Sequence, residues 1–301
     1  MLDAHPDLAI PPESFFITGL HKLRRRYERR DGVFDFPRFA SDLSRLRKFR
    51  DWDVPPEALA AAFGERAPGD YPDAIRRLYR LYADLQGKPR FGDKSPGYVA
   101  RIRLLAEWFP EAIFVHLIRD PRPVALSLSE MEWGPSDVVE GAVRWRHYVG
   151  RGREAGRELG SGRYLEVRYE RLVEDPESTL RRLTSFLHLP FREEMLDYQR
   201  RALERVPARE HRQHVNLVRP PAATRDWRSQ LSAEDLAAVE AVAGDLMDEL
   251  GYERAARPDR RAASRAAEAT DRWRRYLGRR RRKGRLRSRL TVLRPSRSRV
   301  N

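Results

Sequence analysis

The sequence predicts an α/β protein in which a parallel sheet is flanked by helices. Residues 112–118, AIFVHLI, form an almost unbroken apolar and β-branched run, which is typical of a strand buried on both faces. Residues 163–170, RYLEVRYE, alternate polar and apolar side chains, as a strand does. Apolar residues recur at helical spacing in other segments, such as 72–86 and 138–160. Strands that alternate with helices favour parallel pairing.

The composition narrows the class of protein. The chain has 301 residues, enough for one large domain or two small ones, and no cysteine for disulfides, thiolate zinc sites or thiol nucleophiles. No apolar run approaches the length of a membrane span, and the first residues lack a signal-peptide pattern. Because both signals are lacking, we expect a cytoplasmic protein. No His or carboxylate cluster has the spacing of metal ligands, so we also expect no bound metal.

The net charge of +15 resides in the C-terminal tail. Residues 251–301 hold 19 Lys and Arg against 4 Asp and Glu, whereas the first 250 residues hold 41 of each sign. We therefore expect a neutral domain over residues 1–253 and a basic tail over 254–301. The tail has few apolar anchors besides Trp273 and Tyr276, and is expected to be disordered or a frayed helix. It could contact anionic surfaces, without recognising a specific nucleic acid.

The first half of the chain contains one clearly amphipathic helix, at residues 72–86. Asp70 is its expected cap, Pro72 lies in its first turn and Gly87 ends it. Its expected buried face consists of Ile75, Leu78, Tyr82 and Leu85. Residues 21–50 are rich in Arg and are expected to form helices, and residues 90–93 are expected to form a short strand.

The second half alternates helices and strands. A helix over 99–109 precedes the strand 112–118, and the long helix that ends near Gly160 precedes the strand 163–170. Asp175 and Pro176 predict a capped helix start. A capping box at Ser232 and Asp235 predicts the last helix of the domain, closed by Gly251.

The strand 112–118 ends in a candidate anion site. Arg119 is taken as the last residue of the strand, and Ser127 follows eight residues later on the next helix. Anions bind beyond the carboxyl ends of parallel strands, where helix N-termini offer N–H groups. An Arg fork and a Ser hydroxyl there can converge on one phosphate.

These motifs together resemble the sulfotransferases, which use 3′-phosphoadenosine 5′-phosphosulfate (PAPS) as the donor. The similarity covers about residues 1–253 and involves four motifs in the family's order, closest to the bacterial, tyrosylprotein-sulfotransferase-like branch. The matching segments are DAHPD with Glu13-Ser14, then DKSP at 93–96, RDPRPVALS at 119–127, and RYE…DPE from Arg168. The resemblance implies a P-loop NTPase-like sheet.

The resemblance also implies the roles of individual residues. Glu13 would be the base for the acceptor proton, and Lys94 would stabilise the leaving phosphate oxygen. Arg119 and Ser127 would bind the 3′-phosphate, and Tyr169, near the end of its strand, would contact the adenine. Arg219, in an irregular basic loop that ends at Trp227, would add a basic contact. The acceptor, a small molecule or peptide with a hydroxyl or amine, cannot be named from the sequence.

The family's first strand and its glycine-rich 5′-phosphosulfate loop have no counterpart in the 301 residues. We expect that the chain is truncated before this loop, by a late start codon or by real loss, and that it transfers sulfate poorly or not at all. Two alternatives stay open: a non-catalytic nucleotide-binding relative, or a P-loop kinase-like phosphotransferase. A kinase would need a Walker lysine and a Ser or Thr that binds Mg²⁺, and neither is recognisable in the sequence.

Overall fold

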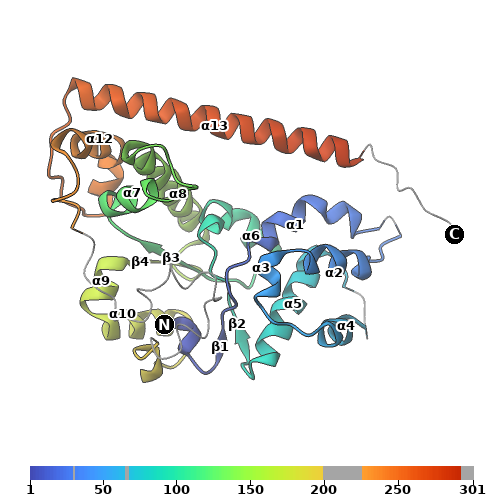
Figure 1. Ribbon diagram of the computed structural model, residues 1–301. Helices are drawn as coiled ribbons and strands as arrows, with labels where there is room; N and C mark the ends of the chain where they lie inside the picture. Colours follow the sequence, from blue (N-terminus) through green and yellow to red (C-terminus); the bar gives the residue numbers. More distant parts are fainter. Residues whose placement is uncertain (30, 65–67, 199–225, 293–301) are drawn as a thin grey trace. The chain divides into compact units, whose positions relative to one another are not determined.

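The computed structural model describes residues 1–29, 31–64, 68–198 and 226–292 (Figure 1). Side chains are described up to residue 279. The chain divides into two compact units. Unit 1 is Met1–Leu117 with Glu154–Ala223, and unit 2 is Ile118–Arg153 with Thr224–Asn301.

Unit 1 contains two pairs of short strands among many short helices, where η marks a 3-10 helix. Up to the first unit boundary its elements are η1 (Leu2–Ala4), β1 (Leu8–Ala9), α1 (Phe16–Leu20), η2 (His21–Arg26), α2 (Phe36–Ser44), α3 (Arg47–Arg50), α4 (Pro56–Gly64), α5 (Tyr71–Leu85), β2 (Arg90–Phe91), η3 (Pro96–Arg101), α6 (Ile102–Trp108) and β3 (Phe114–Ile118). After residue 154 they are β4 (Tyr164–Arg168), α9 (Tyr169–Glu174), α10 (Pro176–Phe186) and η4 (Glu193–Met195).

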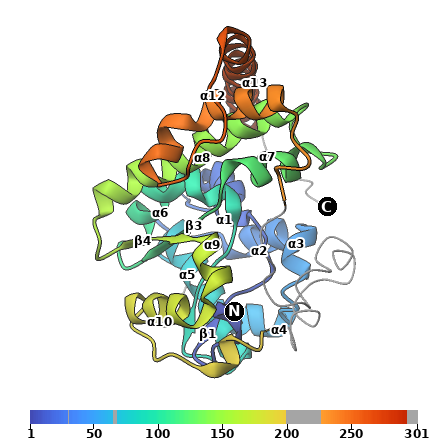
Figure 2. The same ribbon diagram turned by 90° about the vertical axis from the view of Figure 1, so that its left-hand side faces the viewer.

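Unit 2 is helical. Its elements are α7 (Pro121–Ser129), most of α8 (Val138–Leu159), α12 (Ala233–Glu249) and α13 (Arg260–Val292). Helices α7 and α8 lie next to α12 (Figure 2), and the Arg146 guanidinium of α8 donates to the Val242 carbonyl of α12 at 2.8 Å.

The predicted α/β class is confirmed, but the strands do not form the one sheet that the sequence suggested. The described strands form two two-stranded sheets, β1–β2 and β3–β4. Strand β1, which the sequence did not predict, pairs in parallel with β2 in the register Leu8 to Arg90 and Ala9 to Phe91. The ladder is short because Pro11 and Pro12 follow β1 and have no N–H to donate.

Several predicted strand boundaries differ from the structure by one or two residues, and two of these differences involve site residues. Strand β3 ends at Ile118, so Arg119 follows the strand instead of ending it. Strand β4 ends at Arg168, so Tyr169 is the first residue of helix α9 and not a strand residue. Alternation of polar and apolar side chains does not reveal where a strand turns directly into a helix.

The predicted helix caps are confirmed. The side chains of Asp70, Asp175 and Ser232 each accept a hydrogen bond from the backbone N–H three residues later, at 2.8, 3.1 and 3.0 Å. These contacts satisfy N–H groups that the first helical turn leaves without a partner. The expectation for Leu85 was wrong. It is the last residue of α5 and is 44% exposed, although Ile75, Leu78 and Tyr82 on the same face are buried.

The core of unit 1 is rich in aromatic rings. Tyr27, Phe39 and Tyr71 are fully buried, and the Tyr71 ring packs edge-on against Phe39 with centroids 6.1 Å apart. The Tyr71 hydroxyl donates to the Ile17 carbonyl at 2.7 Å, which ties α5 to α1. Edge-to-face aromatic packing stabilises a core beyond the area that it buries.

The first part of the C-terminal tail is an ordered helix that packs in unit 2. Ala262, Ala266, Ala269 and Trp273 of α13 lie on one helical face and are buried in one cluster with Val239 of α12. Charges flank this face, since Arg265 binds Asp235 at 2.7 Å and Arg272 binds Asp137 at 2.8 Å. The structure thus differs from the expected disordered or frayed tail. Alanines, which allow two helices to approach closely, provide the anchors that a search for large apolar residues missed.

We predict that Ala269→Leu destabilises unit 2 by about 1–3 kcal/mol, because Ala269 is fully buried and the leucine would overpack the contact with α12. The control is Ala267→Leu, at an exposed position of the same helix, which should leave the free energy of unfolding nearly unchanged. Urea unfolding of both variants measures the difference. Equal stabilities would show that α13 does not pack on α12.

Candidate active site

The parallel pairing of β1 and β2 brings Glu13 and Lys94 together. Because the strands run in the same direction, the segments that follow them leave the same edge of the sheet. The Gly92 N–H extends the ladder by donating to the Ala9 carbonyl at 2.9 Å. Lys94 Nζ then binds Glu13 Oε2 at 2.7 Å, although the two residues are 81 positions apart. The structure therefore joins the two residues that the sequence proposed as catalytic.

The DAHPD motif holds the first segment in place. His5 is fully buried; its Nε2 donates to the Pro190 carbonyl at 2.8 Å, while its Nδ1 accepts from the Asp7 N–H at 3.0 Å. The Asp3 carboxylate accepts from the Ile10 N–H at 2.9 Å, and Lys88 donates to the Asp3 and Leu8 carbonyls at 2.6 and 2.9 Å. These contacts anchor the chain on the approach to Glu13.

Glu13 has a second cation nearby. Lys48, on α3, places Nζ 3.9 Å from Glu13 Oε1 and 5.4 Å from the centre of the Phe15 ring. The Glu13 side chain is 21% exposed and that of Lys94 is 65% exposed, so Lys94 lies at the surface and Glu13 is partly accessible to solvent. Lys48 was not predicted from the sequence, because nothing in the Arg-rich segment 21–50 distinguishes this cation from its neighbours.

Phe15, two residues after Glu13, has a strained backbone. Its φ is +58°, in the left-handed region that bulky residues rarely adopt. Its ring is 37% exposed and packs edge-on against Tyr98, with centroids 6.2 Å apart. Strain of this kind costs of the order of 1–3 kcal/mol and concentrates at functional sites.

We predict that Phe15→Gly is more stable than Phe15→Ala by up to about 1 kcal/mol, the reverse of the usual order. Both variants lose the ring, and only glycine adopts a φ of +58° without strain. The same two substitutions at Ser41, an exposed position in α2, should favour alanine by about 1 kcal/mol. Thermal unfolding of the four variants tests both differences, and a more stable alanine at position 15 would contradict the strain argument.

The segment after β3 places Arg119 and Ser127 in unit 2. The Arg119 carbonyl accepts from Trp145 Nε1 at 2.8 Å, which fixes its backbone, and Ser127 lies half-buried on α7. Asp120 caps α7 by accepting from the Arg122 N–H at 2.8 Å, while the prolines at 121 and 123 have no N–H. The expectation that this helix N-terminus offers free N–H groups to an anion was therefore wrong. Any phosphate bound there depends on side chains.

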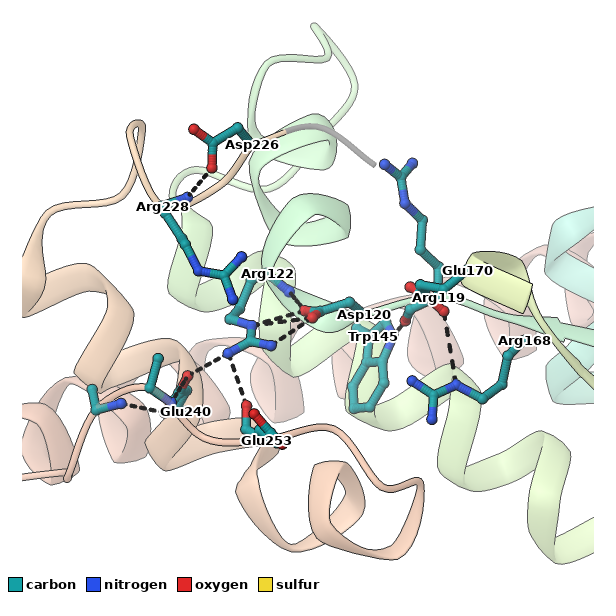
Figure 3. A network of polar contacts seen from close by, with 12 residues as sticks. Arg119, Asp120, Arg122, Trp145, Arg168, Glu170, Asp226, Arg228, Glu240 and Glu253 are labelled. Atoms are coloured by element: carbon teal, nitrogen blue, oxygen red, sulfur yellow. Dashed lines mark hydrogen bonds and ion pairs between the residues drawn. The ribbon is translucent and has the colours of Figure 1, made fainter. Parts of the chain in front are cut away.

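Arg122 is the centre of a buried charge network in unit 2 (Figure 3). Its guanidinium binds Asp120 at 2.6 Å and Glu240 at 2.9 Å, and donates to the Glu253 carbonyl at 3.0 Å. Glu240, on α12, is fully buried and also accepts from the N–H groups of residues 255 and 256, at 3.0 and 2.9 Å. The network ties the turn before α7 to the chain that follows α12.

Trp227 lies beside the same guanidinium. Arg122 and Arg228 lie over its ring, with their Cζ atoms 3.9 and 4.4 Å from the ring centroid, and the side chain is 5% exposed. Cations over an indole face are stabilised by its quadrupole, more strongly when desolvated. Trp227 is therefore anchored within unit 2.

The remaining predicted ligands are placed only in part. Tyr169 is half-buried in unit 1, near Tyr198, whose pKa is raised by burial and then by the neighbouring Tyr169. Arg219 lies outside the described residues. Among the described residues no group of His, Asp and Glu side chains could hold a metal ion, and no helix of this part is long and apolar enough to cross a membrane.

Comparison with known proteins identifies the family. The family model described as Sulfotransferase family matches residues 1–193, more than half of the chain. The chain belongs to the sulfotransferase family. The recognition of this family from the sequence motifs is confirmed.

Two curated relatives illustrate the range of this sulfotransferase's similarities. It is 28% identical over 173 residues to a putative protein-tyrosine sulfotransferase of Caenorhabditis elegans, covering 55% of this chain and 66% of that protein. It is 31% identical over 176 residues to omega-hydroxy-beta-dihydromenaquinone-9 sulfotransferase Stf3 of Mycobacterium bovis, covering 54% of this chain and 41% of that protein. The sulfotransferase chain thus covers less than two thirds of either relative.

A solved structure supports the fold. The sulfotransferase domain from the Synechococcus PCC 7002 olefin synthase superposes with a TM-score of 0.59 at 23% identity, over 84% of this chain and 88% of that one. At this identity the likeness concerns the fold alone. Our sulfotransferase therefore has the α/β fold of a sulfotransferase domain.

Proposed function

We propose that this sulfotransferase transfers a sulfuryl group from PAPS to a hydroxyl or amine acceptor. The observation that carries the proposal is the 2.7 Å contact between Glu13 and Lys94, a base and a cation brought together from distant parts of the sequence at an accessible surface. Sulfuryl transfer needs both: a group that takes the acceptor proton, and a cation for the charge that develops on the departing oxygen.

In this proposal Glu13 is the general base. The acceptor oxygen or nitrogen forms a bond to sulfur as its proton passes to the Glu13 carboxylate, while the bond between sulfur and the phosphate oxygen breaks. Lys94 donates a hydrogen bond to that phosphate oxygen, which keeps the bonding electron pair. Protonation of Glu13 also weakens its ion pair with Lys94, so the ammonium is released when the charge on the leaving oxygen appears.

The nucleotide would be held by Arg119 and Ser127 at its 3′-phosphate and by Tyr169 at its adenine, with Arg219 as a further basic contact. Side chains must bind the phosphate at α7, because Pro121 and Pro123 have no N–H and the Arg122 N–H donates to Asp120. A guanidinium fork and a hydroxyl suit that task. A metal is not needed for this chemistry.

These 301 residues contain no glycine-rich loop that could cradle a 5′-phosphosulfate. We therefore expect these residues alone to turn over slowly, and the transfer assays below use single-turnover conditions to detect slow reactions. The same observation favours the second candidate function, a non-catalytic protein that binds the nucleotide through its 3′-phosphate. Transfer from PAPS distinguishes the two.

We expect adenosine 3′,5′-bisphosphate to bind more tightly than adenosine 5′-monophosphate, and Arg119→Ala to remove about 2–3 kcal/mol of this preference, the size of a charge-assisted contact. Titration calorimetry with both nucleotides measures it. Arg274→Ala, at an exposed arginine of α13, is the control and should leave both affinities unchanged. Equal affinity of the parent protein for the two nucleotides would refute the 3′-phosphate site.

A further inference from the structure

Three polar residues lie next to Glu13 and Lys94 in the sequence, of which Ser14 and Ser95 are buried and Asp93 is half-buried. Ser14 follows Glu13 and is 7% exposed, and Ser95 follows Lys94 and is 9% exposed. Asp93, before Lys94, accepts a hydrogen bond from the hydroxyl of Tyr79, a buried residue of α5. The charged groups of Glu13 and Lys94 thus lie on segments whose neighbouring polar side chains point into the protein.

These inward side chains form one cluster. The Ser14 hydroxyl interacts with the Tyr79 hydroxyl, and the Ser95 hydroxyl interacts with the Asp93 carboxylate and the Tyr98 hydroxyl. These contacts depart from standard hydrogen-bond geometry, since no partner meets it for the buried Ser14, Ser95 and Tyr98 hydroxyls and Asp93 Oδ1. Buried polar groups that are not fully satisfied are rare in folded proteins, and each calls for an explanation. Their concentration beside the Glu13–Lys94 pair points to a role in holding that pair.

We infer that Asp93 is a positioning residue for the Glu13–Lys94 pair, which it controls through the turn that carries Lys94. The Tyr79 hydroxyl holds the Asp93 carboxylate at the start of this turn. Ser14 directly follows Glu13 and Ser95 directly follows Lys94, so a buried hydroxyl lies next to each member of the pair. When it is ionised, the Asp93 carboxylate attracts the Lys94 ammonium, which also binds Glu13. This inference rests on the proposed function of Glu13 and Lys94.

The charges around Asp93 predict how the pair responds to pH. Burial, the largest effect, raises the pKa of Asp93, and the negative charge of Glu13 adds to it; the hydroxyls of Tyr79 and Ser95 and the charge of Lys94 act in the opposite direction. Tyr79, whose own pKa is raised by burial and by Asp93, stays protonated and remains a donor, as does Tyr98. On acidification Asp93 therefore takes up a proton at a higher pH than an exposed aspartate, and Lys94 loses one of its two negative neighbours.

The first test follows Lys94 without any need for activity. The chain has only five lysines, at positions 22, 48, 88, 94 and 283, so reductive ¹³C-methylation gives few NMR signals, and Lys94→Arg identifies that of Lys94. From neutral to acid pH the Lys94 signal should shift as Asp93 is protonated, beginning at a higher pH than it would for an exposed aspartate. In Asp93→Asn this shift should be lost.

The second test is the pH profile of kcat/KM for transfer from PAPS. If transfer requires both Asp93 and Glu13 in the ionised form, a plot of log kcat/KM against pH should reach a slope of about two on its acid side in the parent protein. In Asp93→Asn this slope should be about one. Tyr79→Phe keeps the carboxylate but removes a hydrogen bond that lowers its pKa, so its acid limb should move to higher pH. Tyr27→Phe is the matched control. It removes another buried tyrosine hydroxyl, which donates to Asp42 at 2.8 Å, and should leave the acid side of the pH profile unchanged.

The two tests separate this inference from the proposed function. A uniform loss of rate in Asp93→Asn with an unchanged profile and an unchanged Lys94 titration would overturn the positioning role and leave the proposed transfer intact. Absence of transfer in the parent would refute the proposed function, while the NMR titration would still decide whether Asp93 controls Lys94.

Discussion

Glu13→Gln should lower the rate of sulfuryl transfer about 100- to 10,000-fold, the usual contribution of a general base. Glutamine has nearly the same shape and can still accept a hydrogen bond from Lys94, but it cannot take the acceptor proton. Stability should change little, because the Lys94 side chain is 65% exposed and Glu13 is partly exposed, and ion pairs at the surface contribute about 1 kcal/mol or less. The affinity for adenosine 3′,5′-bisphosphate should stay unchanged.

The measurement is single-turnover transfer of radiolabelled sulfate from PAPS to a panel of phenols, alcohols and amines, with parent and variant of identical length. Glu57→Gln, in the first turn of α4, provides a glutamate control outside the site. If Glu13→Gln and Glu57→Gln transfer at equal rates, Glu13 is not the base, and the contact with Lys94 is a surface ion pair.

Glu240→Ala should destabilise unit 2 by about 3–5 kcal/mol, because it leaves the Arg122 guanidinium buried with one carboxylate fewer. The N–H groups of residues 255 and 256 would also lose their acceptor. The control is Glu249→Ala on the same helix, which removes a surface pair with Arg153 and should cost about 1 kcal/mol or less.

Urea unfolding of the two variants tests the contrast between a buried and an exposed ion pair. The double variant Arg122→Met/Glu240→Leu should recover much of the loss, since apolar residues of similar volume can replace a buried ion pair. Similar small losses in Glu240→Ala and Glu249→Ala would mean that the Arg122 network contributes no more than a surface contact.

The sequence alone determined the local features of this sulfotransferase. Asp70, Asp175 and Ser232 were recognisable as caps, because a cap depends on residues within one turn of each other. The family could be recognised because its motifs are short and ordered along the chain. Glu13 and Lys94 could each be proposed as catalytic from these motifs, and the structure brings them into contact.

Strand boundaries and buried helix faces were harder to predict from the sequence. Strand β1 is only two residues long and exists because β2 pairs with it, so no pattern within Leu8–Ala9 could indicate it. The buried face of α13 consists mainly of alanines, which are equally suited to exposed helices. Only the presence of α12 beside it makes that face a core.

The tertiary structure decided which charges are buried and which polar groups meet. Glu240 lies 118 residues from Arg122, and Tyr79 lies 14 residues from Asp93, with no local pattern to mark either pair. A glutamate in an amphipathic helix is usually exposed, because burying its charge is costly unless a partner is present. That partner is provided by packing between distant segments, which the order of residues along the chain does not reveal.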